Sequence, residues 1–365
     1  MKVIAQRHAL SEALGLVGSI VAGRTPKPVL QCVKLVASEN ALTLLATDLE
    51  VACRYQLPQV EVSQPGEALV PADRLAAIVR ESTEETLTLE VAEETCTITG
   101  AGSRFTVFGY DPAEFPPVAD FTDEPDAEVA SELLTSMISR TLFATAKEHS
   151  RYAISGVLWE VADKKLRLIA TDGRRLAMTK GPLGAKAGRA VSAIVPTKLM
   201  SLIQRVAGGS AQTLGVRVAE TQILIKSANA VLAGNLAQGN FPKYSDVIPT
   251  ECTHKATLNT ATFWHHIRQA ALLTNEESKG VRFSFNGETL TLTSRAPETG
   301  EAEITATIEF EGEPLEVGFN PSYLTDALKV IDSETITFEF TAANKPGMIR
   351  SGTDFTYVLM PVDLG

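Results

Sequence analysis

The segment Leu44-Leu45-Ala46-Thr47-Asp48-Leu49-Glu50 returns 124 residues later as Leu168-Ile169-Ala170-Thr171-Asp172-Gly173-Arg174, and a fainter copy is Leu290-Thr291-Leu292-Thr293-Ser294. Two other phrases keep a similar spacing. Val70-Pro71, Val195-Pro196 and Phe319-Asn320 each precede a helical pattern, and Glu114-Phe115-Pro116 returns as Asn240-Phe241-Pro242. Similarity at a fixed spacing indicates successive copies of one structural unit.

The length of 365 residues fits three copies of about 120 residues, each large enough to bury its own core. A stretch rich in Pro and Asp predicts a linker at residues 112–126, and residues 242–254 are the second linker. We therefore expect three domains, at residues 1–120, 121–250 and 251–365.

Within each copy, hydrophobic periodicity predicts a strand, a helix and three strands, followed by the same series again. In the first copy the strands are expected at residues 2–6, 33–38, 42–46, 51–57, 68–70, 86–91, 95–99 and 105–110. The six helices of the chain are expected at residues 9–22, 73–81, 131–146, 197–206, 260–273 and 321–330. This is an α+β fold built from three doubled units.

Composition excludes several classes of protein. The first residues lack the apolar stretch of a signal peptide, and no apolar run reaches membrane-spanning length, so we expect a soluble, cytoplasmic protein without a membrane partner. Cys32, Cys53, Cys96 and Cys252 lie in apolar surroundings without a Cys-x-x-Cys pair. This favours buried, reduced thiols over disulfides or a zinc site.

No catalytic constellation stands out. The sequence has no phosphate-binding Gly-x-x-x-x-Gly-Lys-Ser/Thr loop, no His-Glu-x-x-His and no Gly-x-Ser-x-Gly, and its histidines lack metal-ligand spacing. Asp48 and Asp172 occur once per copy, whereas catalytic carboxylates converge in one site. We expect both to fix a turn through side-chain to backbone hydrogen bonds, and we expect no enzyme activity, metal or cofactor.

The order and spacing of these phrases, together with Gly280-Val281-Arg282 and the C-terminal Tyr357-Val358-Leu359-Met360-Pro361-Val362-Asp363-Leu364, resemble the bacterial sliding clamps, the beta subunits of DNA polymerase III. The resemblance covers essentially the whole chain. It implies a processivity factor with helices lining a ring and sheets outside, which encircles duplex DNA without reading its sequence.

Geometry indicates how many chains such a ring needs. Twelve helices, each roughly 10 Å across, would leave an opening of about 28 Å, whereas six would leave only about 9 Å. Because a duplex cannot pass the smaller opening, two chains joined head to tail are expected. The resemblance places the dimer contacts at Phe105, Val107, Leu272 and Leu273, and we expect Arg104 to lie opposite Glu298, Glu301 or Glu303.

The net charge of −11 argues against a nucleic-acid partner, but the predicted helices, counted with Lys147 and Glu148 directly after the third, carry eight cations and six carboxylates, a balance of +2. A mildly basic lumen would attract phosphates without reading bases. The predicted DNA contacts, of which Arg24, Arg151 and Tyr152 come from the resemblance, are Arg24, Arg74, Arg80, Arg140, Lys147, Arg151, Tyr152, Lys198, Arg205 and Arg268. The chain departs from a common family pattern at Glu148 and Ala153.

The resemblance further implies a groove that receives short Gln-, Leu- and Phe-containing motifs of the replicative polymerase, the clamp loader and repair proteins. Apolar and Met side chains suit an adaptable pocket, and Asp363 adds a negative charge where some relatives have a basic residue. The implied groove residues are Ile154, Thr171, Gly173, Arg174, Arg175, Leu176, Pro242, Val247, Asn320, Tyr323, Val358, Met360, Pro361, Val362 and Leu364.

Two alternatives remain at this point. A specialised clamp paralogue, such as one tolerant of a clamp-binding inhibitor, would share all of these features, and complementation of a clamp-depleted strain separates it from a housekeeping clamp. A nuclease or other nucleic-acid-processing enzyme would need clustered carboxylates and a divalent metal. Incubation with labelled DNA and magnesium would reveal such an enzyme.

Overall fold

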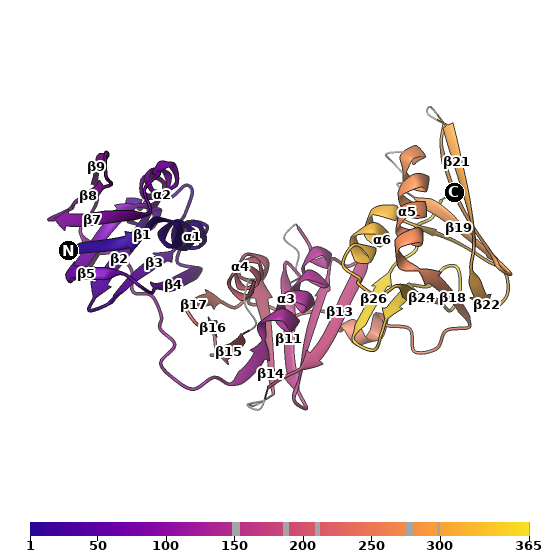
Figure 1. Ribbon diagram of the computed structural model, residues 1–365. Coiled ribbons are helices and arrows are strands. Elements are labelled where there is room, and N and C mark those ends of the chain that lie inside the picture. Colours follow the sequence, from indigo (N-terminus) through magenta and orange to yellow (C-terminus); the bar gives the residue numbers. More distant parts are fainter. Residues whose placement is uncertain (148–153, 185–189, 209–211, 275–279, 298–299, 365) are drawn as a thin grey trace. The chain divides into compact units, whose positions relative to one another are not determined.

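The computed structural model describes residues 1–147, 154–184, 190–208, 212–274, 280–297 and 300–364, which form six α-helices and 26 β-strands (Figure 1). The first copy of the repeat contains β1 (Lys2–Gln6), α1 (Arg7–Gly18), β2 (Cys32–Ser38), β3 (Ala41–Thr47), β4 (Val51–Leu57), β5 (Glu61–Gln64), β6 (Gly66–Pro71), α2 (Ala72–Glu81), β7 (Thr86–Ala92), β8 (Thr95–Thr99) and β9 (Arg104–Phe108).

The second copy contains β10 (Ala127–Ala130), α3 (Ser131–Ser139), β11 (Gly156–Ala162), β12 (Lys165–Thr171), β13 (Arg175–Pro182), β14 (Val191–Pro196), α4 (Thr197–Ala207), β15 (Thr213–Val218), β16 (Gln222–Lys226) and β17 (Ala230–Asn235). The third contains β18 (His254–Asn259), α5 (Thr260–Ala270), β19 (Val281–Asn286), β20 (Thr289–Ala296), β21 (Gly300–Thr307), β22 (Glu309–Glu311), β23 (Leu315–Phe319), α6 (Pro321–Leu328), β24 (Thr335–Phe340), β25 (Gly347–Ser351) and β26 (Phe355–Leu359).

The doubled strand-helix-three-strand unit is confirmed in all three copies, and β5 and β22 are additions that periodicity did not predict. Helix α3 is shorter than expected and ends at Ser139 instead of residue 146. The Thr141 hydroxyl donates to the Met137 carbonyl (2.9 Å), and residues 142–144 continue as a short 3₁₀ helix. No α-helix of the described ranges is long and apolar enough to span a membrane.

The two halves of each copy exchange their leading strands. β1 pairs antiparallel with β7 of the second half, whereas β6, which opens the second half, pairs with β2 of the first. The pairs β10·β15 and β14·β11, and then β18·β24 and β23·β19, repeat this exchange. Neither half of a copy can therefore complete its sheet without the other.

Successive copies are joined through their sheets. β4 of the first copy pairs antiparallel with β17 of the second, which gives an eight-stranded sheet, and β13 of the second pairs with β26 of the third, which gives a nine-stranded sheet. The central copy accordingly contributes to two compact units. Unit 1 is Met1–Thr135, Leu183–Gly188 and Lys198–Leu236, and unit 2 is Ser136–Pro182, Arg189–Thr197 and Ala237–Gly365.

Paired helices cover the sheets in each unit. Helix α1 buries Leu10, Leu14 and Val17, spaced as one helical face, and packs on α2, β3 and β4. In unit 2, α5 lies beside α6 and inserts Phe263 among Phe283 and Phe338. Each fully buried aromatic side chain contributes about 1.5–3 kcal/mol, so this core fixes the strands that carry the site.

Candidate docking groove and nucleic-acid interface

The turn between β12 and β13 is built by the repeated Thr-Asp phrase. The Asp172 Oδ1 atom accepts hydrogen bonds from the N–H groups of Arg174 (2.9 Å) and Arg175 (3.0 Å), and the Thr171 hydroxyl donates to the Arg175 carbonyl (2.7 Å). Gly173 takes a left-handed φ of +88°. The predicted turn-forming role of this aspartate is confirmed.

Asp48 forms the same turn between β3 and β4. Its Oδ1 atom accepts from the N–H groups of Glu50 (3.0 Å) and Val51 (2.8 Å), and the Thr47 hydroxyl donates to the Val51 carbonyl (3.0 Å). Leu49 occupies the left-handed position, with φ +78°. The two turns are therefore equivalent in backbone but differ in their exposed side chains.

In unit 2, the β12–β13 turn borders a cavity of about 120 Å³. At the cavity, the side chains of Val247 and Met360 remain 44% and 43% exposed, which is unusual for large apolar groups. The cavity brings together nine of the fifteen predicted groove residues: Thr171, Gly173, Arg174, Arg175, Leu176, Pro242, Val247, Val358 and Met360.

Lys243 and Tyr244 also line the cavity and were missed by sequence reasoning. The Tyr244 hydroxyl donates to Glu160 Oε2 (2.6 Å), and burial together with this carboxylate raises the pKa of Tyr244 to about 12. The available signal was the position of both residues directly after Pro242, where Lys243 precedes and Tyr244 begins the 3₁₀ turn Tyr244–Val247. The phenol therefore stays protonated throughout the physiological range, and its hydrogen bond to Glu160 holds this turn against β11.

Six predicted groove residues lie outside the cavity lining. Ile154 is buried, Asn320 caps α6 by accepting from the Ser322 N–H (3.0 Å), and Tyr323 stacks on Arg175. The remaining three line a separate cavity of about 490 Å³ and are Pro361, Val362 and Leu364.

Arg175 supports the groove from below. Its guanidinium is buried, donates to Asp172 Oδ2 (3.0 Å), Asp326 Oδ2 (2.7 Å) and the Phe143 carbonyl (2.9 Å), and lies 4.5 Å from the centre of the Tyr323 ring. Burial acts to lower the pKa of Arg175, but its ion pairs outweigh burial and raise it. Because its donors are engaged, Arg175 positions the groove. The Arg174 side chain is exposed, and its hydrogen bond with the Tyr323 side chain raises the pKa of Arg174.

The predicted DNA-contacting residues fall into several environments. Arg24 and Lys147 are exposed, and Arg74 and Arg80 lie beside the carboxylates of Asp73 and Glu81. Lys198 pairs with Asp48, and Arg205 donates to the Gly15 carbonyl. The Arg268 guanidinium lies 4.6 Å from the centre of the Trp264 ring. Arg151, Tyr152, Glu148 and Ala153 lie outside the described residues.

Arg140 requires a correction. Its side chain is only 16% exposed and pairs with Asp354 (2.7 Å) and Asp332 (3.6 Å). These carboxylates neutralise its charge, so we remove it from the DNA-contacting set. With the observed bounds the six helices carry six cations and five carboxylates, a balance of +1, smaller than the expected +2.

Two of the four predicted dimer contacts lie at exposed apolar positions, and Leu273 is partly buried. Leu272 is 80% exposed and Phe105 is 41% exposed, whereas Val107 is largely buried in its own unit. Phe108, which was not predicted, is 78% exposed on the same strand, β9. Glu298 lies outside the described residues.

Features of metal or redox chemistry are few. Within the described ranges no three His, Cys, Asp or Glu side chains are grouped to hold a metal ion. The four cysteines are free thiols, and burial raises the pKa of Cys32 and Cys96 to about 11 and that of Cys53 to about 12. The predicted burial is confirmed for these three, and Cys252 is partly exposed.

Comparison with known proteins gives concordant results. The chain matches the DNA polymerase III beta subunit family in three parts, the N-terminal domain at residues 1–119, the central domain at 128–243 and the C-terminal domain at 245–363. It is 32% identical to the beta sliding clamp of Chlamydia muridarum, over 100% of this chain and 99% of the relative.

Solved structures agree. The DNA polymerase III subunit beta of Pseudomonas aeruginosa is 31% identical with a TM-score of 0.94, and the same organism's sliding clamp bound to griselimycin is 31% identical with a TM-score of 0.95. Each comparison covers 100% of both chains. The three-domain clamp fold therefore extends over the whole chain.

Proposed function

The chain belongs to the DNA polymerase III beta subunit family and is a DNA sliding clamp, and on this premise we propose that two copies close a ring around duplex DNA and recruit partners through the groove of unit 2. It serves the polymerase as a non-catalytic processivity factor in the cytoplasm, organised in three domains at residues 1–120, 121–250 and 251–365. Neither alternative raised by the sequence, a paralogue or an enzyme, has a specific observation in its favour.

The sheet junctions carry the proposal of a head-to-tail dimer. Each half of a copy ends with a series of three strands. Inside the chain, the third strand of one copy's first half pairs with the third strand of the next copy's second half, as in β4·β17 and β13·β26. The equivalent strands left over are β21 and β9, and in the described residues each is the last strand of its sheet. Pairing β21 of one chain with β9 of another repeats the same junction and closes a ring after two chains.

Exposed apolar side chains at these edges support that junction. Exposed Leu272 and partly buried Leu273 follow α5, and exposed Phe105 is carried by β9. Unpaired strand edges with exposed apolar groups are association surfaces. Enclosure then binds DNA through weak phosphate contacts from residues such as Arg24, Arg74, Arg80, Lys147, Arg151, Tyr152, Lys198, Arg205 and Arg268.

The groove is the proposed partner site. Its apolar wall of Leu176, Val247 and Met360 suits Leu and Phe side chains, and the exposed Arg174 offers a donor for polar atoms of the motif. These partners comprise the replicative polymerase, the clamp loader and repair proteins with short Gln-, Leu- and Phe-containing motifs.

A crossed experiment separates the two surfaces. Leu272→Ala with Leu273→Ala should yield monomers at micromolar concentration in analytical ultracentrifugation, yet bind a labelled Gln-Leu-Ala-Leu-Phe peptide normally. Deletion of residues 360–365 should do the reverse, because losing an apolar anchor costs about 2 kcal/mol, roughly thirtyfold in affinity. An intact dimer in the first variant refutes the interface, and unchanged peptide binding in the second refutes the groove.

A further inference from the structure

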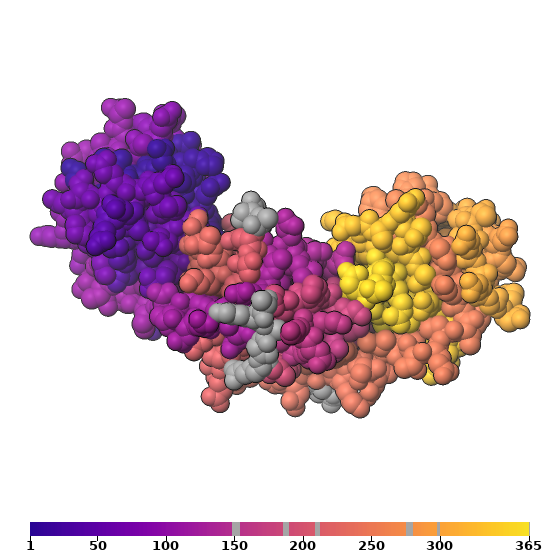
Figure 2. Space-filling view, turned by 60° about the horizontal axis from the view of Figure 1, so that its bottom comes forward, coloured from indigo at the N-terminus to yellow at the C-terminus, as the bar shows by residue number. Residues whose placement is uncertain are grey.

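After β26 the chain leaves the groove and crosses to another sheet of unit 2. The Met360 N–H donates to the Arg174 carbonyl (2.8 Å) at the β12–β13 turn, and the Val362 N–H donates to the Gly318 carbonyl (2.9 Å) in β23. We call residues 360–364 the strap. Its first residue lines the groove, and its last residue is Leu364. Figure 2 shows the yellow C-terminal part of the chain beside the magenta part of this unit, where β26 pairs with β13.

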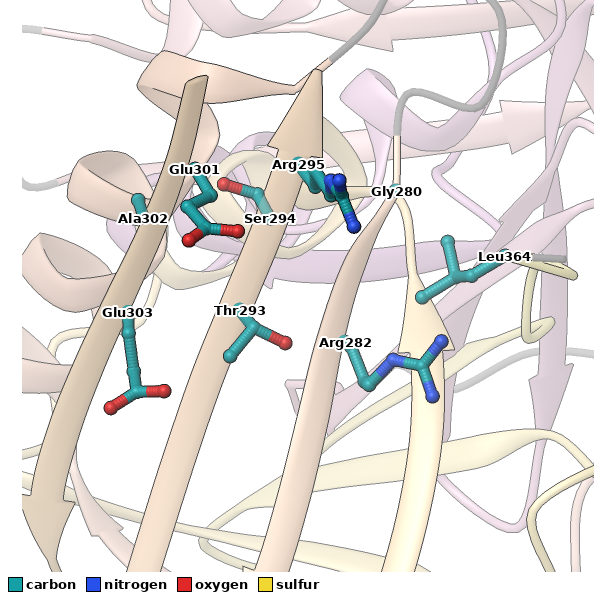
Figure 3. Close-up of a pocket in the computed structure, with 9 residues that line it drawn as sticks. All are labelled: Gly280, Arg282, Thr293, Ser294, Arg295, Glu301, Ala302, Glu303 and Leu364. Atoms are coloured by element: carbon teal, nitrogen blue, oxygen red, sulfur yellow. The ribbon is translucent and has the colours of Figure 1, made fainter. Parts of the chain in front are cut away.

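Leu364 is seated where two glycines leave room for it. A Cβ atom on Gly280 would lie 2.1 Å from Leu364 Cδ2, and one on Gly318 would lie 2.7 Å from Leu364 Cγ. Neither glycine has a left-handed φ, so the backbone does not require glycine at these positions. Figure 3 shows the Leu364 side chain beside Gly280 and Arg282. Leu364 shares the space above the two glycines with Val362, whose carbonyl oxygen would lie 2.6 Å from the Gly318 Cβ and whose Cγ2 would lie 3.1 Å from the Gly280 Cβ.

The surroundings make this leucine the apolar anchor of the strap. Two cavities, of about 360 and 490 Å³, adjoin Leu364, and Arg282 lines both. Their other polar groups include Glu301, Glu303 and Glu316, so an aliphatic side chain finds its apolar contacts at the seat. Together with the Val362 hydrogen bond, the Leu364 side chain ties the end of the strap to Gly280, directly before β19, and to Gly318 in β23.

We propose that Leu364 is a positioning residue for the groove: seated over Gly280 and Gly318, it holds the strap so that Met360 stays in the groove wall. This inference rests on the proposed role of the groove as a peptide site. A strap without its anchor must be ordered again at each binding event, and immobilising several side chains weakens binding.

A double-mutant cycle tests the anchor in the full-length protein. Leu364→Ala removes the anchor and Gly280→Ala fills its seat, so each should weaken binding of the labelled Gln-Leu-Ala-Leu-Phe peptide by about tenfold. The double variant should be no weaker than either single variant, because alanine at position 364 no longer meets the new methyl group. Leu364→Met keeps the apolar contact and should bind like wild type.

Hydrogen exchange supplies a readout that general damage to the sheet would not reproduce. Both single variants should speed amide exchange in residues 360–364 while β19 and β23 keep wild-type protection. Three results would each refute the anchoring role of Leu364. They are a loss of peptide affinity in the double variant equal to the product of the two single losses, wild-type affinity in Leu364→Ala, and faster amide exchange throughout β19. If wild type binds no peptide, the proposed groove function fails, and the exchange arm still decides whether Leu364 holds the strap.

Discussion

The junctions β4·β17 in unit 1 and β13·β26 in unit 2 share a backbone and differ in side chains. In both, an aspartate fixes the turn before the first strand of the pair, β4 or β13. A backbone N–H at the end of the partner strand then donates to a carbonyl of that turn: Asn235 to Glu50 (2.9 Å) in unit 1, and Met360 to Arg174 (2.8 Å) in unit 2. The linker residue Phe121 is buried in unit 1, whereas its repeat counterpart in unit 2, Val247, is 44% exposed beside the groove.

The two junctions therefore share the backbone structure of the repeat. We infer that the volume of their side chains determines whether a junction has room for a ligand. In unit 1, Phe121 packs with Leu224 and Val231, and the Lys226 ammonium lies 5.6 Å from the centre of its ring. In unit 2, the residue at the same offset from the Phe-Pro phrase is Val247, which lines the cavity instead of filling it. Aromatic side chains bury far more surface than valine, so we expect this residue to account for part of the difference.

The largest expected effect comes from the buried ion pairs under the groove. Arg175→Ala leaves Asp172 and Asp326 without their partner and should lower the free energy of unfolding by about 3 kcal/mol. Its counterpart Val51→Ala should cost about 1–2 kcal/mol. Both tryptophans lie in unit 2, so urea unfolding followed by fluorescence reports Arg175→Ala directly. A loss equal to that of Val51→Ala, measured by circular dichroism, would contradict the supporting role of Arg175.

Exchanging the linker residues should exchange the junctions' properties in part. Val247→Phe fills the groove and should weaken peptide binding at least tenfold, or about 1.4 kcal/mol. Phe121→Val creates a hollow in unit 1 and should cost about 1–2 kcal/mol of stability without changing peptide affinity. Anisotropy titration of both variants decides, and wild-type affinity in Val247→Phe would show that this cavity is not the peptide site.

The left-handed turn position gives a smaller effect of opposite sign at the two junctions. A non-glycine residue in this region costs about 1–2 kcal/mol, so Gly173→Leu should lower stability by about 1 kcal/mol. Leu49→Gly relieves the same strain but adds flexibility to the unfolded chain, so its net gain should be only about 0.5 kcal/mol. Thermal unfolding of the pair is the measurement. A cost in both variants would mean that backbone strain does not distinguish the turns.

The smallest effect is the acid dependence of unit 1. Burial acts to raise the pKa of Asp48, but hydrogen bonds from Lys198 and the Val51 N–H outweigh it and lower the pKa. Its stabilisation is therefore present above the ordinary aspartate pKa of about 4 and is lost as the pH falls through the lowered value. Asp48→Asn should be less stable than wild type by under about 1 kcal/mol at pH 7, since Lys198 is partly exposed.

The matching measurement is urea unfolding of wild type and Asp48→Asn at several pH values. The difference between the two proteins should shrink to zero in acid. A difference in the free energy of unfolding that stays constant from pH 7 to pH 3 would show that the Asp48–Lys198 ion pair does not stabilise unit 1.

Local signals in the sequence predicted the scaffold well. The repeated Thr-Asp phrase gave both turns, and the starts of all six helices were predicted within two residues because capping and periodicity are local properties. Long-range pairing was out of reach. No local pattern near Arg140 predicts its contact with Asp354, which lies 214 residues away. Without that carboxylate, Arg140 is predicted to be an unpaired cation of the lumen.

The groove was predictable only in part for the same reason. Its members on β13, β26 and the second linker meet through strand pairing that no local pattern specifies. Tyr244 was missed because it is held at the groove by a hydrogen bond to Glu160, 84 residues earlier in the chain. Leu364 was assigned to the groove, but its side chain sits over Gly280 and Gly318, where only the three-dimensional structure shows the room.

Retention on circular DNA tests the central claim of enclosure most directly. Protein assembled by its clamp loader on a nicked plasmid should stay bound during gel filtration at moderate salt and be released when a restriction enzyme cuts the circle once, because phosphate contacts alone are weak. The Leu272→Ala, Leu273→Ala variant should not be retained even on the intact circle. Equal binding before and after linearisation, at the same salt and with free DNA ends, would contradict a ring that holds DNA by encircling it.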